Sequence, residues 1–255
     1  MGMLFPCSEI HASDSVRQQS PEGVLETVTL DYKEFFSTYR VMRLGIALGA
    51  SGLAAGTGFD EKIRNWYQDH VRDRTADHVA GKFRDFGNGF YIVSLSLVSA
   101  VLGNFLSSNE EASALGTWGE RTLRAIIVGG PPLIFLKHAI GSSRPGDNNG
   151  SRWRPFQDDN SVSGHAFIGA VPFLTLARMY NDTWYVKYAL FAASALPALS
   201  RIHDNTSFPS QAALGWFLAW AATSSIFERD NGKEKFKVVP MITAGGVGIK
   251  AVWEW

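Results

Sequence analysis

The chain is poor in several features that would classify it at once. Its 255 residues include a single cysteine, Cys7, which excludes an internal disulfide framework and any cysteine-rich zinc site. Its formal net charge is zero, because Lys plus Arg and Asp plus Glu both total 24. That balance argues against a nucleic-acid-binding protein with a basic face, although it leaves room for a local positive pocket. No apolar run reaches the roughly 18 uninterrupted residues of a clear membrane span, and no internal repeat is visible.

The composition nevertheless supports a folded core, since 45% of the residues are hydrophobic and 19% are charged. Residues 1–30 are polar and lack periodicity, so we expect a flexible leader. Within the leader, Ile10-His11-Ala12 follows a short apolar patch and resembles the end of a secretory signal with a small residue at the cleavage point. The alternative is a disordered terminus without a targeting role, and one cysteine fits either compartment.

The middle of the chain, residues 31–230, predicts an all-α domain with a six-helix core. A charged segment, 60–84, lies between the first two apolar stretches and is spaced like one or two amphipathic helices. Short membrane spans are one interpretation of the apolar stretches, but this charged segment favours a water-soluble or membrane-peripheral bundle. The six stretches of helical length are Leu44–Phe59, Tyr91–Leu106, Leu123–Ala139, Ala166–Tyr180, Val186–Leu199 and Ala212–Phe227.

The tail, residues 231–255, changes character. Two alternating or β-branched runs flank Ala244-Gly-Gly-Val-Gly248, a pattern that predicts a β hairpin packed on or beside the bundle. Trp253 and Trp255 at its end offer aromatic surface for a partner or a membrane.

Polar residues gather at the ends of three apolar helices. The first group is Lys137 and Arg144, separated by six residues, with Pro145 stopping any helix before it. These cations either converge on one anion or are ordinary solvated residues at a helix end, where the dipole favours positive charge.

The second group is Ser163-Gly164-His165, directly before the fourth apolar stretch. Ser163 is a good N-cap, and Gly164 lets the backbone approach a ligand closely. Free N–H groups at a helix start form a natural phosphate cradle, which His165 would face. A satisfied structural histidine is the simpler alternative for His165.

The third group lies between the fifth and sixth stretches, in residues 200–211. Arg201 ends an apolar helix, and its bidentate guanidinium suits phosphate oxygens better than a lysine does.

In this order, Lys-x6-Arg-Pro, Ser-Gly-His and Ser-Arg resemble the three-part signature of the superfamily of type 2 phosphatidic acid phosphatases, bacterial non-specific acid phosphatases and vanadium haloperoxidases. The motifs cover Lys137–Gln211, and the helical layout extends the resemblance to about Met42–Phe227. The possible leader, the charged segment and the terminal hairpin look like the periplasmic bacterial branch. The resemblance implies the six-helix core of that superfamily and an envelope location, periplasmic or membrane-associated.

The resemblance also implies a ligand set. Lys137, Arg144 and Arg201 would hold the phosphoryl oxygens, with hydrogen bonds added by Ser163 and the N–H of Gly164. His165 would be the general acid for the leaving alkoxide. No metal or other cofactor is expected, because the cations neutralise the charge that develops in phosphoryl transfer.

Two positions depart from the family pattern in a way that affects the chemistry. Ser207 stands where the family has its nucleophilic histidine, and Gln211 stands where it has the aspartate that orients that histidine. A glutamine brings no negative charge, and a serine is a poor nucleophile without a base or metal beside it. A smaller departure is Val162, where proline is usual.

A substitute nucleophile is the remaining route to turnover. His203 lies four residues before Ser207 and would share its face in a helical turn, with Asp204 as a weaker candidate for an orienting group. Haloperoxidase activity is the least expected, because that branch holds vanadate covalently through the histidine missing here.

Three functions stay open on the sequence alone. The first is a pseudophosphatase that binds phosphate, a phosphomonoester or a lipid head group with little or no hydrolysis. The second is an active phosphatase with a non-standard nucleophile. The third is an envelope protein that binds a partner through its tail and keeps a relic pocket. We expect a phosphorylated ligand, possible contact with a membrane surface and no nucleic acid; the oligomeric state is not predicted.

Overall fold

A computed structural model describes residues 21–106, 109–147, 149–230, 236–243 and 246–253, with only the backbone described for 21–22 and for the two strands. The helices are α1 (Pro21–Phe35), α2 (Thr38–Gly56), α3 (Phe59–His70), α4 (Arg74–Phe86), α5 (Gly89–Phe105), α6 (Glu110–Ile140), a 3₁₀ turn (Pro145–Asp147), α7 (Gly164–Met179), α8 (Trp184–Ala193), α9 (Leu196–His203) and α10 (Pro209–Asp230). The strands are β1 (Phe236–Thr243) and β2 (Gly246–Trp253).

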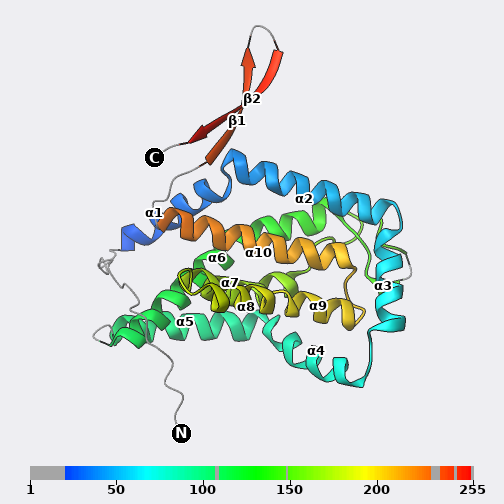
Figure 1. Cartoon of the computed structure of the whole chain (residues 1–255), viewed down its shortest axis with the longest axis horizontal. Coiled ribbons are helices and arrows are strands. Elements are labelled where there is room, and N and C mark those ends of the chain that lie inside the picture. The colour runs from blue at the N-terminus through cyan, green and yellow to red at the C-terminus, as the bar shows by residue number, and fades with distance from the viewer. Residues whose placement is uncertain (1–20, 107–108, 148, 231–235, 244–245, 254–255) are drawn as a thin grey trace.

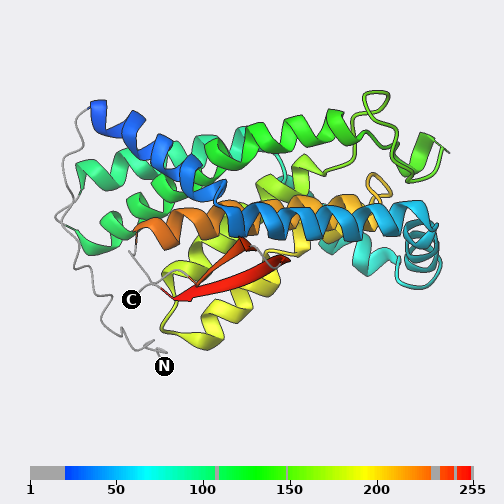
Figure 2. The ribbon, with the colours of Figure 1, turned by 90° about the horizontal axis from the view of Figure 1, so that it is seen from above.

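The core is built around α10, which packs against α1, α2, α6, α7 and α9. Figures 1 and 2 show α10 lying along α2 and over α6 and α7. A helix enclosed on most sides must carry apolar or small side chains around its whole circumference. α10 meets this requirement with its alanines, serines and large apolar residues. The largest core side chains include Phe167 and Leu174 of α7 with Leu218 and Ile226 of α10. The predicted all-α class is confirmed for the bundle.

The fifth apolar stretch forms two helices instead of one. α8 ends at Ala193, and α9 begins at Leu196 with Pro197 in its first turn. Proline lacks an N–H and is tolerated at a helix start but not in the interior, which explains the break. Ser194, at the break, accepts a hydrogen bond of 2.8 Å from the indole N–H of Trp216 on α10. The break lets α9 turn toward the end of the bundle that carries α3.

The charged segment also forms two helices, as the amphipathic spacing allows. Gly58 precedes α3 with a φ of 72°, a left-handed conformation in which glycine is unstrained. Asp73 caps α4 by accepting from the N–H of Ala76 at 2.7 Å. α3 contacts α9 and α10, and α4 contacts α9 and α7, so the two helices cover one end of the bundle.

The prediction of a flexible leader over residues 1–30 is wrong for its last ten residues, which are helical because α1 begins at Pro21. The physical reason is a buried ionic anchor that the polar composition concealed. Asp31, fully buried, accepts two hydrogen bonds from Arg124 of α6, at 2.8 and 2.9 Å, and pairs with Arg229 of α10. Residues 1–20, with the possible signal segment and Cys7, lie outside the described residues.

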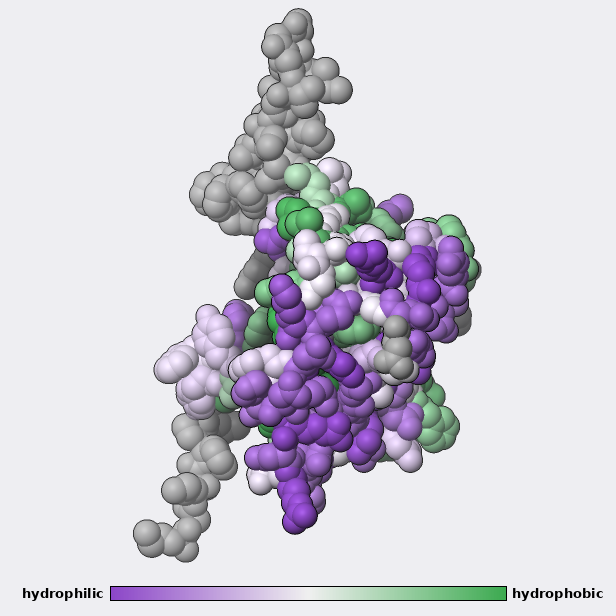
Figure 3. Space-filling model, turned by 90° about the vertical axis from the view of Figure 1, so that its right-hand side faces the viewer, coloured by the Kyte–Doolittle hydropathy of each residue, from purple (hydrophilic) through white to green (hydrophobic). Residues whose placement is uncertain are grey.

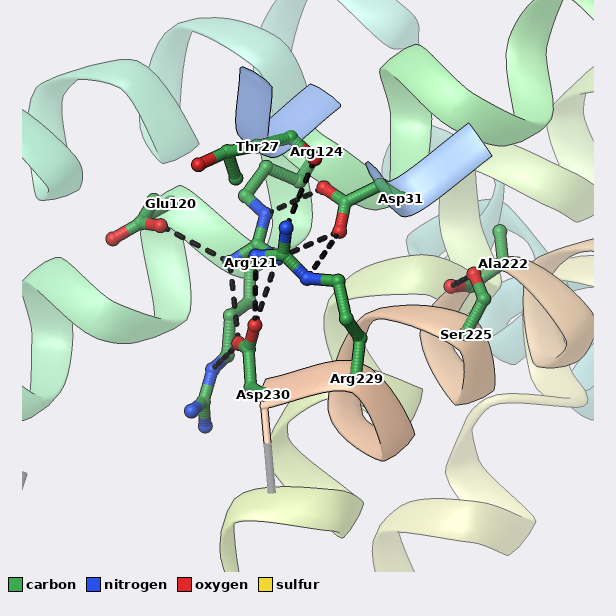
Figure 4. A network of polar contacts seen from close by, with 9 residues as sticks. All are labelled: Thr27, Asp31, Glu120, Arg121, Arg124, Ala222, Ser225, Arg229 and Asp230. Carbon is green, nitrogen blue, oxygen red and sulfur yellow. Dashed lines mark hydrogen bonds and ion pairs between the residues drawn. The ribbon is translucent and has the colours of Figure 1, made fainter. Parts of the chain in front are cut away.

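That anchor belongs to a larger network, drawn in Figure 4, at the end of the bundle opposite α3. Asp230 accepts from Arg124 at 2.8 Å and also pairs with Arg121 and Arg229. The guanidinium groups lower the pKa of Asp230 despite its partial burial, which alone would raise it. The network fixes α1, α6 and α10 to one another.

The two strands pair antiparallel, from Phe236 opposite Trp253 to Thr243 opposite Gly246. Figure 1 shows them beyond α2. The packing of their side chains, and hence the predicted packing of the hairpin on the bundle, lies outside the described residues.

Candidate anion-binding site

The end of the bundle covered by α3 and α4 is the hydrophilic face seen in Figure 3, and the three motif segments meet there. The first segment begins with Lys137 in the last turn of α6. Gly141 then turns the chain at a φ of 58°, and a Cβ added there would lie 2.1 Å from the carbonyl oxygen of Arg154. Only glycine fits this position. The turn leads the chain through Ser142 and Ser143 to Arg144, which is exposed.

The second segment is the start of α7, as predicted. Ser163 is the N-cap, and its Oγ accepts from the N–H of Ala166 at 3.3 Å. The N–H groups of Gly164 and His165 stand ahead of the first helical hydrogen bonds, so they lack intrahelical acceptors. A Cβ added at Gly164 would meet nothing nearer than Leu133 Cδ2 at 3.9 Å. The side of Gly164 on which a Cβ would stand is therefore uncrowded.

The third segment runs from the end of α9 into α10. Arg201 lies in the last turn of α9. Asn205 takes a φ of 57°, a conformation that asparagine tolerates better than most residues, and reverses the chain. The N–H of Ser207 then donates to the carbonyl of Arg201 at 3.2 Å. Ser207 is thereby held next to the end of α9, two residues before α10 begins, and it is buried.

Four predicted residues converge electrostatically on one point. Burial lowers the pKa of His165, and the positive charges of Arg201, Arg144 and Lys137 lower it further. Three cations, two from the first motif segment and one from the third, thus act on one imidazole. Within the described part of the chain, none of the three forms an ion pair with a carboxylate, whereas most of the other arginines there do. Positive charge without a carboxylate partner would favour a bound anion at this point.

Arg201 is the most strongly constrained of the three cations. Its Nε is buried and has no hydrogen-bond partner among the described residues. Burial is the largest cause that lowers the pKa of Arg201, and the positive charges of Arg144 and Arg84 lower it as well. The nearby Asp204 opposes this effect, yet its carboxylate pairs with Arg84 of α4, at 3.4 Å. An unpaired buried donor is costly, so an acceptor from a ligand would be favoured here.

Gln211 is a structural clamp that holds the three segments together. Its Oε1 accepts from Asn160 Nδ2 at 3.0 Å and from the N–H of Phe208 at 2.9 Å. Its Nε2 donates to Ser142 Oγ at 3.0 Å and to the carbonyl of Ser143 at 2.8 Å. Its backbone carbonyl accepts from the N–H of Ser163 at 3.0 Å. All four hydrogen-bonding positions of the amide are in use, which leaves none for orienting a nucleophile.

The neighbouring residue strengthens the same junction. Ser210 donates from both its N–H, at 2.8 Å, and its Oγ, at 2.5 Å, to the buried carboxylate of Asp60 on α3. Burial raises the pKa of Asp60, while these hydrogen bonds oppose the shift. α3 is thus attached to the first turn of α10, beside the clamp.

His203 is engaged away from Ser207. It is 2% exposed, and its Nε2 lies 2.7 Å from Asp77 Oδ1 on α4. Its other ring nitrogen lies 3.5 Å from Tyr67 Oη. The carboxylate partner of His203 is therefore Asp77 and not Asp204, the group that the sequence had suggested. This contact joins α4 to α9, and the hydrogen bond lowers the pKa of Asp77.

The sequence reasoning missed three contributors to the site: Arg84, Asp77 and Asn160. Arg84 and Asp77 are indistinguishable from solvated charges in a segment more than 100 positions from their partners. Asn160 lies in a loop without periodicity. Ser142 and Ser143 were not assigned a role either, although their position between Lys137 and Arg144 in the first motif is a signal that could have found them.

Comparison of the chain with protein-family models, curated proteins and solved structures found no match. The resemblance to the phosphatase and haloperoxidase superfamily therefore rests on the motif residues themselves.

Proposed function

We propose that this chain binds a phosphate, or the phosphate group of a phosphomonoester, and hydrolyses the ester weakly or not at all. The observation that carries the proposal is the convergence of Lys137, Arg144 and Arg201 on His165 without a carboxylate partner in the described residues. In this proposal the six-helix core is of the acid phosphatase and haloperoxidase type, and the protein works in the bacterial envelope.

Each group has a defined part in holding the anion. The three cations neutralise the phosphate oxygens, and Arg201 offers its unpaired buried Nε. The N–H groups at the start of α7 donate along the helix dipole. Ser163 accepts from Ala166 through its lone pair, which leaves its hydroxyl proton for the ligand. Burial and the positive charges of its neighbours lower the pKa of His165, and the negative charge of a bound anion would oppose that effect.

Weak turnover follows from the two positions at the third motif. An attacking histidine needs a carboxylate to fix its tautomer and to stabilise its charge. Here Ser207 lacks such a base, since His203 is committed to Asp77. Gln211 is neutral and committed to the clamp.

Thermal melts with phosphate, vanadate and sulfate test the binding. We expect each anion to raise the melting temperature of the parent chain and to have much less effect on Arg201→Ala. Arg152→Ala is the matched control, because Arg152 is an exposed arginine in the loop between the first two motifs. Its melt should respond like that of the parent. Equal responses in all three proteins would show that the anions do not bind at the proposed pocket. No response in any of them would favour the alternative of an envelope protein with a relic site.

Phosphate release from a generic phosphomonoester between pH 4 and 8 tests the chemistry. We expect little or no release from the parent and measurable release from the double variant Ser207→His with Gln211→Asp, which supplies both the attacking histidine and its carboxylate partner. Because Gln211 makes four side-chain hydrogen bonds, circular dichroism must show that this variant is folded. Release by the parent that disappears in His165→Ala would instead show that another group attacks, and would overturn the proposal of impaired turnover.

A further inference from the structure

The packing of α5 is the reverse of that of a helix on a water-soluble bundle. Its buried positions are Ile92 and three small residues, Ser96, Ser99 and Gly103. Its other large apolar side chains are exposed, and the two at its ends, Phe90 and Phe105, are 75% and 79% exposed. Between them, the exposed set includes Leu95, Leu97, Val98 and Leu102. A soluble helix buries its large apolar residues and exposes its small and polar ones.

Small residues bring α5 and α6 into close backbone contact. A Cβ added at Gly103 would lie 2.3 Å from the Cα of Gly116, and one added at Gly119 would lie 2.4 Å from the carbonyl oxygen of Ser96. Helices pair in this way in lipid, where burying large apolar side chains between helices gains nothing over leaving them among acyl chains.

The exposed apolar surface of α5 is too wide for one protein partner. At about 100° per residue, the buried positions span only about 60° of the circumference, whereas the exposed large apolar residues span about 200°. A helix that docks into a protein groove buries a stripe little more than 100° wide. A fluid that surrounds the helix can cover the whole arc.

The length and charge of α5 fit the same environment. None of its 17 residues is charged, and the nearest charged residues on either side are Asp85 and Glu110. At 1.5 Å per residue the helix is about 25 Å long, close to the roughly 30 Å of a bilayer's hydrocarbon core. Its partner α6 is the helix, among the described residues, that is long and apolar enough by itself to cross a membrane, and only 33% of its most apolar window is buried.

We propose that α5 is a lipid-facing helix whose outer side lies among the acyl chains of a bilayer. The inference rests on packing and does not depend on phosphate binding. The corner between α4 and α5 contacts the anion site, since a Cβ added at Gly87 would lie 2.9 Å from that of His165. One end of α5 therefore places the site beside the boundary between acyl chains and head groups.

An environment-sensitive dye on the full-length chain tests the proposal. With Cys7, the single cysteine, changed to serine, the dye is attached to Leu97→Cys on the outer side of α5 or to Asn65→Cys on exposed α3. On adding phosphatidylcholine vesicles, we expect a blue shift and quenching by acyl-chain quenchers for the dye on α5 and neither for the dye on α3. Arg201→Ala should leave both responses unchanged, which separates this test from that of phosphate binding.

Charge placed on the outer side should weaken lipid binding. We expect Leu95→Glu with Leu102→Glu to reduce vesicle binding roughly tenfold or more, because it puts two carboxylates into acyl chains. Trp66→Glu on α3 removes a large exposed side chain from the charged end and should have no such effect. Circular dichroism checks that each variant is folded. If the chain is folded and the fluorescence of the dye on α5 does not change when vesicles are added, the proposal is overturned. A dimer in detergent-free solution in which a second copy of the chain shields the dye would also overturn it.

Discussion

Replacing Gln211 by glutamate tests the clamp with the smallest change of shape. In the parent, Nε2 donates to Ser142 Oγ at 3.0 Å and to the carbonyl of Ser143 at 2.8 Å. A carboxylate oxygen at that point donates nothing and faces the Ser143 carbonyl. Ser142 cannot turn its own proton to the carboxylate without leaving the carbonyl of Ser151, to which it donates at 2.7 Å. Gln211→Glu therefore loses two hydrogen bonds and buries a charge.

The magnitude follows from those contacts. Two lost hydrogen bonds are worth about 2 kcal/mol, and the unpaired buried charge adds about 1–3 kcal/mol. We expect Gln211→Glu to reduce the free energy of unfolding by about 3–5 kcal/mol at pH 7.5. In a chain of this size, this lowers the melting temperature by about 2–4 °C per kcal/mol.

The loss must also depend on pH. A protonated carboxyl would again donate to Ser143, so the fold favours the protonated form and raises the pKa of the introduced group above about 4.3, the value for an unfolded chain. The penalty is therefore small below that pH and grows as the pH rises through the folded pKa.

Urea unfolding of the parent, Gln211→Glu and the exposed control Gln157→Glu, from pH 4 to 7.5, measures both effects. The control should stay within about 0.5 kcal/mol of the parent. A difference between Gln211→Glu and the parent that is below about 1 kcal/mol at pH 7.5, or that does not change with pH, would refute the clamp.

Further predictions concern other parts of the molecule. Arg124→Met removes the hydrogen bonds that buried Asp31 and partly buried Asp230 accept from Arg124, although Arg229 still pairs with both, and should cost about 2–4 kcal/mol in urea unfolding; a cost below about 1 kcal/mol would contradict the role of the network. The lowered pKa of Asp77 means that its contact with histidine stabilises the fold above the ordinary value of 3.8 and is lost as the pH falls through the lowered one. Melting curves of the parent and Asp77→Asn should therefore differ at neutral pH and converge in acid, and a constant difference would be inconsistent with this. Gly103→Val should push α5 from α6 and cost at least about 1–3 kcal/mol, whereas an unchanged melting temperature would show that the close contact is absent. Sulfate does not titrate between pH 5 and 8, so tighter sulfate binding at lower pH would report protonation of His165, and His165→Gln should abolish that trend; a trend that survives the substitution would assign the proton elsewhere.

The bundle was predictable from the sequence, and its boundaries were less so. Apolar stretches of helical length gave the helices, but Pro197 divided one of them, and the anchor of Asp31 made a helix of a polar segment. Both differences come from single residues whose effect depends on position or on a distant partner. Periodicity does not record such effects.

The candidate site shows the same division. The spacing of Lys137, Arg144 and Arg201 placed three cations at helix ends, where the structure brings them together around His165. The motif predicted that Gln211 cannot act as a charged orienting group. It did not predict the structural role of Gln211, because the four hydrogen-bond partners of its amide come from three segments. Asp77 could not be assigned to His203 before the fold was known, since 126 positions separate them.

The two ends of α10 are fixed in different ways, and this limits how the protein can move. Near one end, Ser210 and Gln211 are tied to α3 and to the motif loops, and at the other Asp230 is tied to α6. Sliding by one turn, or rotation about its axis, would break both sets of contacts at once. α10 is therefore held rigidly in place, and its central amides should exchange hydrogen only on global unfolding. The part free to shift when an anion enters is α4, because it is joined to the site partly through ion pairs that water reaches. A response to ligand would then be a hinge motion of α4 against a rigid bundle to which α3 stays attached.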